Sequence, residues 1–464
     1  MTVKAMKTVP TLALAAALGL AGCGFKAQPV PALVAAPAGW AAPAPAGARD
    51  VWPAADWWRG FASDELDRLV AEARQNNTDL GQAVARVAQA EAQLRAAGAS
   101  LWPALSLSLG ADGRRPAGGN QWGDSYSAGL SASYEVDFWG ANAADRAASA
   151  AALDASGFDQ ETVALTVTAG VATTYLQVLS LRDRLDVARR NLAIAEDVLR
   201  LVEVKVGAGA ASDLDLAQQR TVVAQRRASI PPLEQQLREQ ATALAVLLGR
   251  VPGGFEVAGQ SLDPVKVPGV AAGLPASLLQ RRPDLKAAET RLIGADADIH
   301  AARAAFFPQV SLSAGMSLAD GALGGVFSLS NAAYSIGASL VQAIFDGGRR
   351  AAQQDLAEAR KVELLEAYRG AILAAFRDAE VALGAVDALN RQRLLQDEVL
   401  AQARRALELA QVQYRAGSTD LLAVLSAQQS LYSAEDAAAQ VKLSALQAVV
   451  TLYRVLGGGW QAPA

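Results

Sequence analysis

Four segments of the chain alternate between apolar residues and small polar residues. This two-residue period is typical of a β-strand with one apolar face. We predict strands at residues 103–113, 125–138, 308–318 and 333–345. Their apolar positions carry mainly leucine, valine, alanine, isoleucine or tyrosine, and the intervening positions carry mainly serine or glycine. The pattern indicates two antiparallel hairpins, each with an apolar face opposite a small polar one.

Helical periodicity surrounds both hairpins. Residues 64–101 and 285–307 read as helices that end near a proline, and residues 142–205 contain apolar positions spaced alternately three and four apart. A continuous helix over residues 142–205 would be about 95 Å long at about 1.5 Å per residue. The corresponding seam at residues 372–410 is weaker. We therefore expect most of the chain to be helical, in agreement with its many alanines.

Each long helix stops at a short polar turn that contains glycine. The turns lie near residues 207–213 and 415–420, and an apolar helical pattern resumes after each of them. Glycine is a common helix C-cap, and a short turn brings the next helix back antiparallel. The sequence therefore predicts two long helical hairpins with their tips at these turns.

The two halves of the chain repeat the same plan. Residues 79–108 align without a gap on residues 284–313, which stand 205 positions later, and the return strands align with a shift of 208 positions. We accordingly divide the body into a first repeat at residues 52–250, a connector at residues 251–283 and a second repeat at residues 284–464. Each repeat runs from helix through two strands to a helical hairpin.

The amino terminus has the form of a leader. Two lysines precede an apolar run at residues 9–20, which is too short to span a bilayer, and we predict a signal peptide at residues 1–22. The run ends in Leu-Ala-Gly followed by Cys23, which resembles a bacterial lipobox, where the cysteine thiol receives a lipid. We expect lipidation at Cys23 and a Pro/Ala-rich tether at residues 23–51. An ordinary secretory leader with an incidental cysteine is the alternative.

The composition excludes several kinds of chemistry. One cysteine and one histidine in 464 residues cannot form an intrachain disulfide or a Cys/His metal site. We expect no metal and no cofactor beyond the covalent lipid, and a net charge of −4 gives no reason to expect nucleic acid. The sequence contains no nucleophile motif or phosphate loop, and His300 falls at the repeat position of Arg95. We therefore expect His300 on a helix surface or interface, in a protein that is not an enzyme.

The strands fit a transmembrane β-barrel, in which apolar residues face lipid and small polar residues face water. A soluble antiparallel sheet packed on a core is the alternative. Four strands cannot close a barrel, because about eight is the smallest number that works, so several chains would be required. Glu135 and Asp137 belong to the inward-facing series, and we expect them in a hydrated lumen. A non-conducting coiled-coil lipoprotein would explain the heptads but not these strands.

Four motifs spread over the chain are Trp57-Trp58-Arg59-Gly60-Phe61, Arg281-Arg282-Pro283-Asp284, Phe307-Pro308-Gln309-Val310-Ser311-Leu312 and Tyr414-Arg415-Ala416-Gly417. With them the chain resembles the TolC-type outer-membrane factor family, in particular its NodT/OprM-like lipoprotein branch, which serves RND-type efflux pumps.

The resemblance implies a mainly α protein with a transmembrane β part. It implies a homotrimer with a 12-stranded β-barrel, four strands from each chain, continued by an α-helical coiled-coil tunnel in the periplasm. It also implies docking to a periplasmic membrane-fusion adaptor and an inner-membrane RND-type transporter, with passive conduction of drugs or other small molecules through the outer membrane. An exit duct for type I secretion or for metal efflux shares the fold and is the alternative.

The resemblance further implies a gate at the tips, held by acids and by tyrosine or arginine links. Tyr414 matches the family tyrosine, whereas Ala423 and Ser426 stand where some members have aspartate. We hypothesise that Asp420, repeated by threefold symmetry, repels itself or binds cations at the constriction, and that Arg415 pins the hairpin shut. The other acids near the tips are Asp213 and Asp215. A helix N-cap is the alternative role for Asp213 and Asp420.

Overall fold

The computed structural model describes residues 34–42, 52–115, 122–269, 273 and 275–461. The expected signal peptide, Cys23 and most of the expected tether lie outside these residues. The chain divides into two compact units. Among the described residues, the first unit contains 86–157 and 287–368, and the second contains the remainder. Each unit is described by itself.

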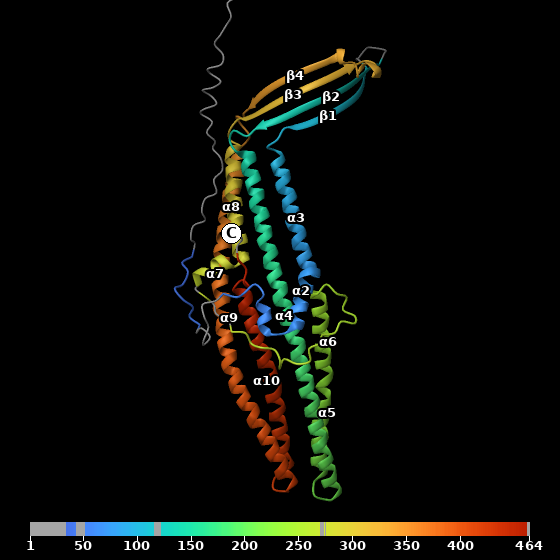
Figure 1. The fold of residues 1–464 in the computed structure, drawn as a ribbon, viewed down its shortest axis with the longest axis vertical. Helices are drawn as coiled ribbons and strands as arrows, with labels where there is room; N and C mark the ends of the chain where they lie inside the picture. Colours follow the sequence, from blue (N-terminus) through green and yellow to red (C-terminus); the bar gives the residue numbers. More distant parts are fainter. Residues whose placement is uncertain (1–33, 43–51, 116–121, 270–272, 274, 462–464) are drawn as a thin grey trace, which may run out of the picture. The chain divides into compact units, whose positions relative to one another are not determined.

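The first unit contains a four-stranded antiparallel sheet in the order β1-β2-β3-β4 (Figure 1). Its strands are β1 (Ala104–Arg114), β2 (Gly123–Val136), β3 (Gln309–Asp320) and β4 (Ala332–Val341). Two 3-10 turns, η2 (Leu323–Gly325) and η3 (Leu329–Asn331), lie in the connection between β3 and β4. Every strand begins and ends within four residues of the range predicted from alternation. Within the chain, β1 and β4 are edge strands.

The remaining elements are helical. They are η1 (Trp57–Phe61), α2 (Asp64–Asn76), α3 (Thr78–Ala99), α4 (Ala141–Gly207), α5 (Asp213–Ala228), α6 (Ile230–Leu247), α7 (Pro275–Arg281), α8 (Pro283–Ala304), α9 (Arg349–Arg415) and α10 (Leu421–Val455). The long helices α4 and α9 have 67 residues each. In the second unit α4 is followed by α5, and α9 by α10, so that two helical hairpins form (Figure 1).

Two helices predicted as continuous are interrupted, and the sequence explains both breaks. The first break is at Asn77, whose backbone is extended. The Asn77 side-chain oxygen accepts hydrogen bonds from the backbone N–H groups of Asp79 (2.9 Å) and Leu80 (3.1 Å) and so caps α3. The second break is at Ser229, where α5 ends and α6 begins with two prolines in its first turn. Proline is tolerated there because the first N–H groups of a helix have no partner within it.

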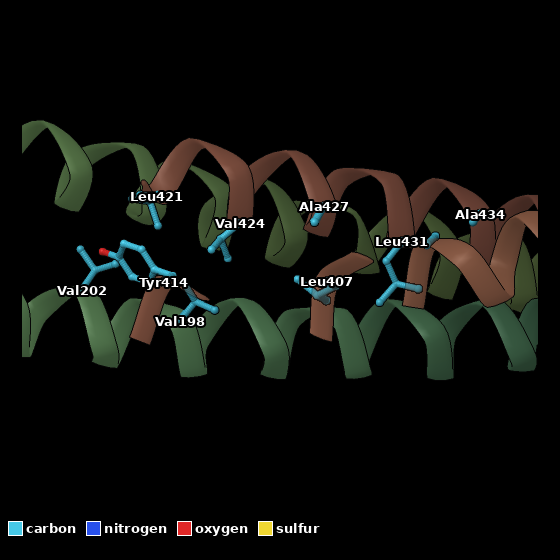
Figure 2. Packing of buried hydrophobic residues seen from close by; sticks show 10 residues of the cluster. Val198, Val202, Leu407, Tyr414, Leu421, Val424, Ala427, Leu431 and Ala434 are labelled. Carbon is cyan, nitrogen blue, oxygen red and sulfur yellow. The ribbon is translucent and has the colours of Figure 1, made fainter. Parts of the chain in front are cut away.

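A hydrophobic seam joins α4, α9 and α10 in the second unit (Figure 2). Val198 and Val202 of α4 pack against residues of α9 and α10 and are nearly fully buried. The apolar spacing at residues 142–205 also passes through Leu199, but Leu199 is only half-buried, because the buried stripe of α4 passes through Val198 instead. The other buried members of this cluster are Ala403, Leu407, Tyr414, Leu421, Val424, Ala427, Leu431 and Ala434.

Candidate conducting wall and gate

The register of the sheet sorts the strand residues onto two chemically different faces. One row across all four strands reads Leu107, Leu130, Met316 and Tyr334, and the adjacent row reads Ser106, Ser131, Gly315 and Ser335. The same separation holds along the ladders, since Leu109 pairs with Ala128 and Gly110 with Ser127. The leucines of β1 are about 70% exposed. An exposed apolar face opposite a small polar face is the arrangement that a lipid-facing wall requires.

The polar face is tightly packed because glycine repeatedly lies opposite serine. A Cβ atom added at Gly110 would lie 2.7 Å from the Ser127 hydroxyl oxygen, and one added at Gly129 would lie 2.9 Å from that of Ser108. Both distances are shorter than ordinary contacts, so these glycines make room for the opposite hydroxyls. Hydroxyl groups therefore cover this face, and a hydroxyl-lined wall suits the passage of water and polar solutes.

The two acids predicted to face a lumen lie in different settings. Glu135 is on the polar face, paired with Ser311. Asp137 lies beyond the last paired residue of β2, and its carboxylate accepts hydrogen bonds from the backbone N–H groups of Asn142 (3.2 Å) and Ala143 (2.8 Å). These contacts place a negative charge at the N-terminus of α4, where the helix dipole favours it. The structure thus gives Asp137 a capping role that alternation did not reveal.

Aromatic contacts fix the chain where β2 leads into α4. The Trp139 ring stacks on Phe307 at 4.6 Å between centroids, and its indole N–H donates to the Pro308 carbonyl oxygen (2.8 Å). The imidazole Nε2 of His300 lies 3.2 Å from the Trp139 carbonyl oxygen. His300 is therefore a partly buried contact residue on α8, as expected for a helix surface or interface position.

The two hairpin tips have the same backbone design. Gly209 and Gly417, which are equivalent in the repeat, both have positive φ (71° and 73°) in the turn that ends the long helix. Ser212 and Asp420 are also equivalent, and each caps the returning helix. The Ser212 hydroxyl accepts from the N–H of Asp215, and the Asp420 carboxylate accepts from that of Ala423 (3.1 Å for both).

Two of the predicted gate acids, Asp215 and Asp420, form helix-capping contacts. Asp420 is exposed and caps α10, so the alternative role considered for it is present in this structure. Asp215 closes a capping box, because its carboxylate accepts from the Ser212 N–H (2.9 Å). Asp213 and Arg415 are exposed, and neither forms an ion pair within the part of the chain that the structure describes. Their role at a constriction stays a prediction.

Tyr414 is the one predicted gate residue that lies in the interior. Its side chain is 5% exposed, and its hydroxyl has no hydrogen-bond partner among the described residues. Burial, with a smaller contribution from the charge of Asp215, raises the pKa of the Tyr414 hydroxyl above its usual value. Tyr414 lines a small cavity of about 170 Å³ together with residues of α4, α9 and α10.

Lys205, which the sequence reading missed, links the two hairpins at Tyr414. Its ammonium nitrogen lies 4.1 Å from the centroid of the Tyr414 ring and donates to the Tyr414 carbonyl oxygen (2.6 Å). The only signal in the sequence was a basic residue in the last turn of a helix, where lysine often binds terminal carbonyl groups. Here the carbonyl belongs to the other hairpin, so the contact joins α4 to α9.

The Arg-Arg-Pro-Asp motif forms a structural clasp. The Arg282 guanidinium donates to both carboxylate oxygens of Asp284 (3.0 and 2.7 Å) and to the Val455 carbonyl oxygen at the end of α10 (3.2 Å). Arg281 lies over the Trp52 ring at 5.0 Å. A Cβ atom at Gly457 would collide with the Arg281 carbonyl oxygen, and Gly457 has positive φ (87°). The motif therefore ties the start of the second repeat to the end of the last helix.

Polar residues interrupt the seam of α4, α9 and α10. Glu435 is 9% exposed, accepts from the Asn191 amide (2.7 Å) and pairs with Arg404 (3.3 Å). One heptad earlier, Gln428 is 4% exposed, and neither atom of its amide has a partner among the described residues. No group of three or more His, Cys, Asp or Glu side chains in the described ranges could hold a metal ion.

Comparison with known proteins accounts for nearly the whole chain. The family model of outer membrane efflux proteins matches residues 69–250 and 274–458. The pyoverdine export outer membrane protein OpmQ of Pseudomonas aeruginosa is 46% identical over 460 residues, covering 97% of this chain and 96% of that protein. The cation efflux system protein CusC of Escherichia coli is 33% identical, covering 89% of this chain and 90% of that protein.

A solved structure gives the same answer for the fold. The Neisseria gonorrhoeae MtrE outer membrane channel, crystallised in its open state, matches with a TM-score of 0.85 at 28% identity, covering 95% of this chain and 99% of that one. The sequence predictions of a mainly α channel protein with a β part, located in the outer membrane, are confirmed. The chain belongs to the family of outer membrane efflux proteins.

Proposed function

We propose that three copies of the chain form the exit duct of a tripartite pump, together with a periplasmic membrane-fusion adaptor and an inner-membrane RND-type transporter. The observation that carries this proposal is the sheet, which has an exposed apolar face, a hydroxyl-lined face and two unpaired edges. Edges left open in lipid would expose unsatisfied backbone groups, so further copies must close the wall.

The mass of the detergent-extracted protein, corrected for bound detergent, tests this assembly. A trimer that conducts ions in planar bilayers is the expected result. A stable monomer would contradict the channel and favour a non-conducting envelope lipoprotein.

A matched pair of variants tests which face of the sheet contacts lipid. Leu107→Lys should reduce trimer yield, since lysine on a lipid face costs about 2–4 kcal/mol at mid-bilayer, whereas Ser106→Lys on the opposite face should assemble.

We further propose that the exported molecule is pyoverdine or a chemically related compound. The support is the 46% identity to OpmQ, which exceeds the 33% identity to CusC. The test is to express this chain in a Pseudomonas aeruginosa strain that lacks OpmQ and to measure pyoverdine in the medium and in the periplasm. Restored export is expected. Failure of a protein that still forms conducting trimers would reject the substrate while preserving the channel.

We propose that the thiol of Cys23 carries a covalently attached lipid and that the protein uses no cofactor. Four residues ending at Cys23 match the lipobox pattern, and a charged and apolar leader precedes them. Radiolabelled palmitate should enter the wild-type protein and not the Cys23→Ala variant. Equal labelling of both proteins would contradict lipidation at this residue.

We propose that Asp420 acts at the constriction in addition to capping α10, and that Arg415 helps to hold the tip closed. Asparagine caps helices as well as aspartate does but carries no charge, so Asp420→Asn separates the two roles. A gate role predicts altered leak conductance and ion selectivity in Asp420→Asn. Ser212→Ala, at the equivalent cap of the first hairpin, is the control for a lost cap. Wild-type conductance in Asp420→Asn would reduce Asp420 to a cap.

A further inference from the structure

The two halves of the internal repeat also share the same strand register in the sheet. Shifting β1 by 205 positions and β2 by 208 positions carries the pair Leu107–Leu130 onto Leu312–Ala338, which is a pair of β3 and β4. The neighbouring pair Leu105–Ala132 is likewise carried onto Val310–Leu340. The two hairpins are therefore equivalent residue by residue, in their pairing as well as in their sequence.

The same equivalence defines how a second copy would pair. β1 corresponds to β3 and β2 to β4, so the β2–β3 contact inside one chain is the template for a contact between β4 and the β1 strand of the next chain. We infer that this junction has one register, in which Ala338 lies opposite Ala111 of the partner subunit. This inference rests on the proposed trimer and adds the residues that join its protomers.

The template transfers the pairs of the β2–β3 ladder one by one. Leu130–Met316 becomes Ala338 opposite Ala111 of the partner subunit, and Ser131–Gly315 becomes Ser339 opposite Gly110 of the partner subunit. Ala132–Ala314 becomes Leu340 opposite Leu109 of the partner subunit. The shared ladder extends over residues 335–341 of one chain and 108–114 of the partner.

Two features that were not used in the transfer support this register. First, it sets Ala338 and Leu340 opposite Ala111 and Leu109 of the partner subunit, and Ser339 opposite Gly110 of the partner subunit, so the two faces continue across these three pairs. A slip of one residue would place the apolar set of one strand on the polar face of the next.

Second, glycine on the polar face lies opposite serine at six pairs inside the chain, namely Ser108–Gly129, Gly110–Ser127, Gly129–Ser317, Ser131–Gly315, Ser313–Gly337 and Gly315–Ser335, and the exception is Gly123 at the end of β2, which lies opposite Arg114. A slip of two residues would set Gly110 opposite Gly337 or Val341 of its neighbour. Of these three registers, only the inferred one gives Gly110 a serine, Ser339, on its open side.

Cysteine cross-linking tests the register in outer membranes that contain the full chain. The variant with Ala338→Cys and Ala111→Cys should oxidise to covalent dimers and trimers on non-reducing gels, because opposed residues of an antiparallel pair fall within the Cα separation that a disulfide spans. Leu340→Cys with Leu109→Cys is a second pair on the same face. Leu130→Cys with Met316→Cys is the repeat-equivalent control, and it should form an intramolecular disulfide under the same oxidation.

Cysteine pairs shifted by two residues along β1 distinguish the inferred register from its neighbours. Ala338→Cys combined with Leu109→Cys, or with Gly113→Cys, should give no more cross-linking than the single-cysteine variants, which also control for Cys23. Cross-linking of a shifted pair in place of the matched ones would overturn the register and leave the trimer intact. Monomers in every pair, with the control disulfide formed, would overturn the junction, and the detergent-corrected mass of the same variants would then show whether the trimer itself forms.

Discussion

The ammonium group of Lys205 lies over the ring of Tyr414, at 4.1 Å from its centroid, and donates to the Tyr414 carbonyl oxygen. The two residues come from α4 and α9, so this contact joins the two helical hairpins next to their tips. Both interactions depend on one positive charge. A tip that opens by separating the hairpins must break them together.

Lys205→Met should therefore weaken the closed tip. A cation–π contact is worth about 0.5–2 kcal/mol and a hydrogen bond from a charged group about 1.5–3 kcal/mol, and about 1.4 kcal/mol shifts an equilibrium tenfold. We expect leak conductance in planar bilayers to rise on the order of tenfold. Arg200→Met removes an exposed ion pair with Asp197 on the same helix and is the control. Equal leak in the two variants would show that the Lys205 contact does not hold the tip.

Gln428→Leu should stabilise the closed tunnel. The Gln428 amide is buried in the seam of α4, α9 and α10, and its two polar atoms have no partners within the described ranges. Removing an unsatisfied buried amide should raise the free energy of unfolding by about 1–3 kcal/mol. Thermal melts of the purified trimer measure this, with exposed Gln413→Leu as control. A lower melting temperature would mean that the amide finds a partner in the assembled protein.

A buried polar residue in a helical seam commonly fixes register at a cost in stability. If Gln428 has that role, the stabilised Gln428→Leu trimer should conduct less when the tip is driven open. Glu435 differs, since Asn191 and Arg404 satisfy its carboxylate. The two polar layers should therefore respond differently to replacement by leucine, with Glu435→Leu destabilising the protein.

The sequence predicted the elements whose signals are periodic. Alternation located all four strands, and the heptad spacing located α4. The apolar spacing did not predict the break at Asn77, because a helix interrupted by one capping residue keeps nearly the same spacing on both sides. The contact of Lys205 with Tyr414 was also beyond reach, since it joins positions 209 apart whose approach depends on how two hairpins pack. Alternation placed Asp137 in the strand, but β2 ends at Val136. The alternating pattern does not show where the paired part of a strand ends, so it could not reveal that Asp137 caps α4.

Arg282→Lys should destabilise the second unit. Lysine cannot reproduce the two-pronged pairing with Asp284 while also reaching the Val455 carbonyl oxygen. We expect a loss of roughly 2–3 kcal/mol in the free energy of unfolding, measured by thermal or denaturant unfolding. Arg281→Lys is the matched control, since lysine can keep a cation over the Trp52 ring. Comparable losses at both positions would argue against the clasp.

Asp346 should make the start of α9 sensitive to acid. It lies beyond the last residue of β4, and its carboxylate accepts from the Arg350 guanidinium (2.7 Å) and from the N–H groups of Gly348 (3.1 Å) and Arg350 (3.3 Å). The Arg350 side chain, acting against the smaller effect of burial, lowers the pKa of the Asp346 carboxyl below its usual 3.8. A lowered pKa in the folded state contributes stability above the unfolded value, and that stability is lost as pH falls through the folded value.

Asp346→Asn should consequently lower the melting temperature at pH 7, and the difference from wild type should shrink as pH falls below the unfolded value of 3.8, where the charge begins to lose its stabilising effect. Asparagine can still accept a hydrogen bond at the helix start, so the difference reports mainly on the charge. Asp355→Asn on the same helix, which forms no ion pair within the described residues, is the control and should shift neither value. A difference between wild type and Asp346→Asn that stays constant from pH 7 to pH 3 would contradict the assignment to ionisation, since only a charge effect disappears on protonation.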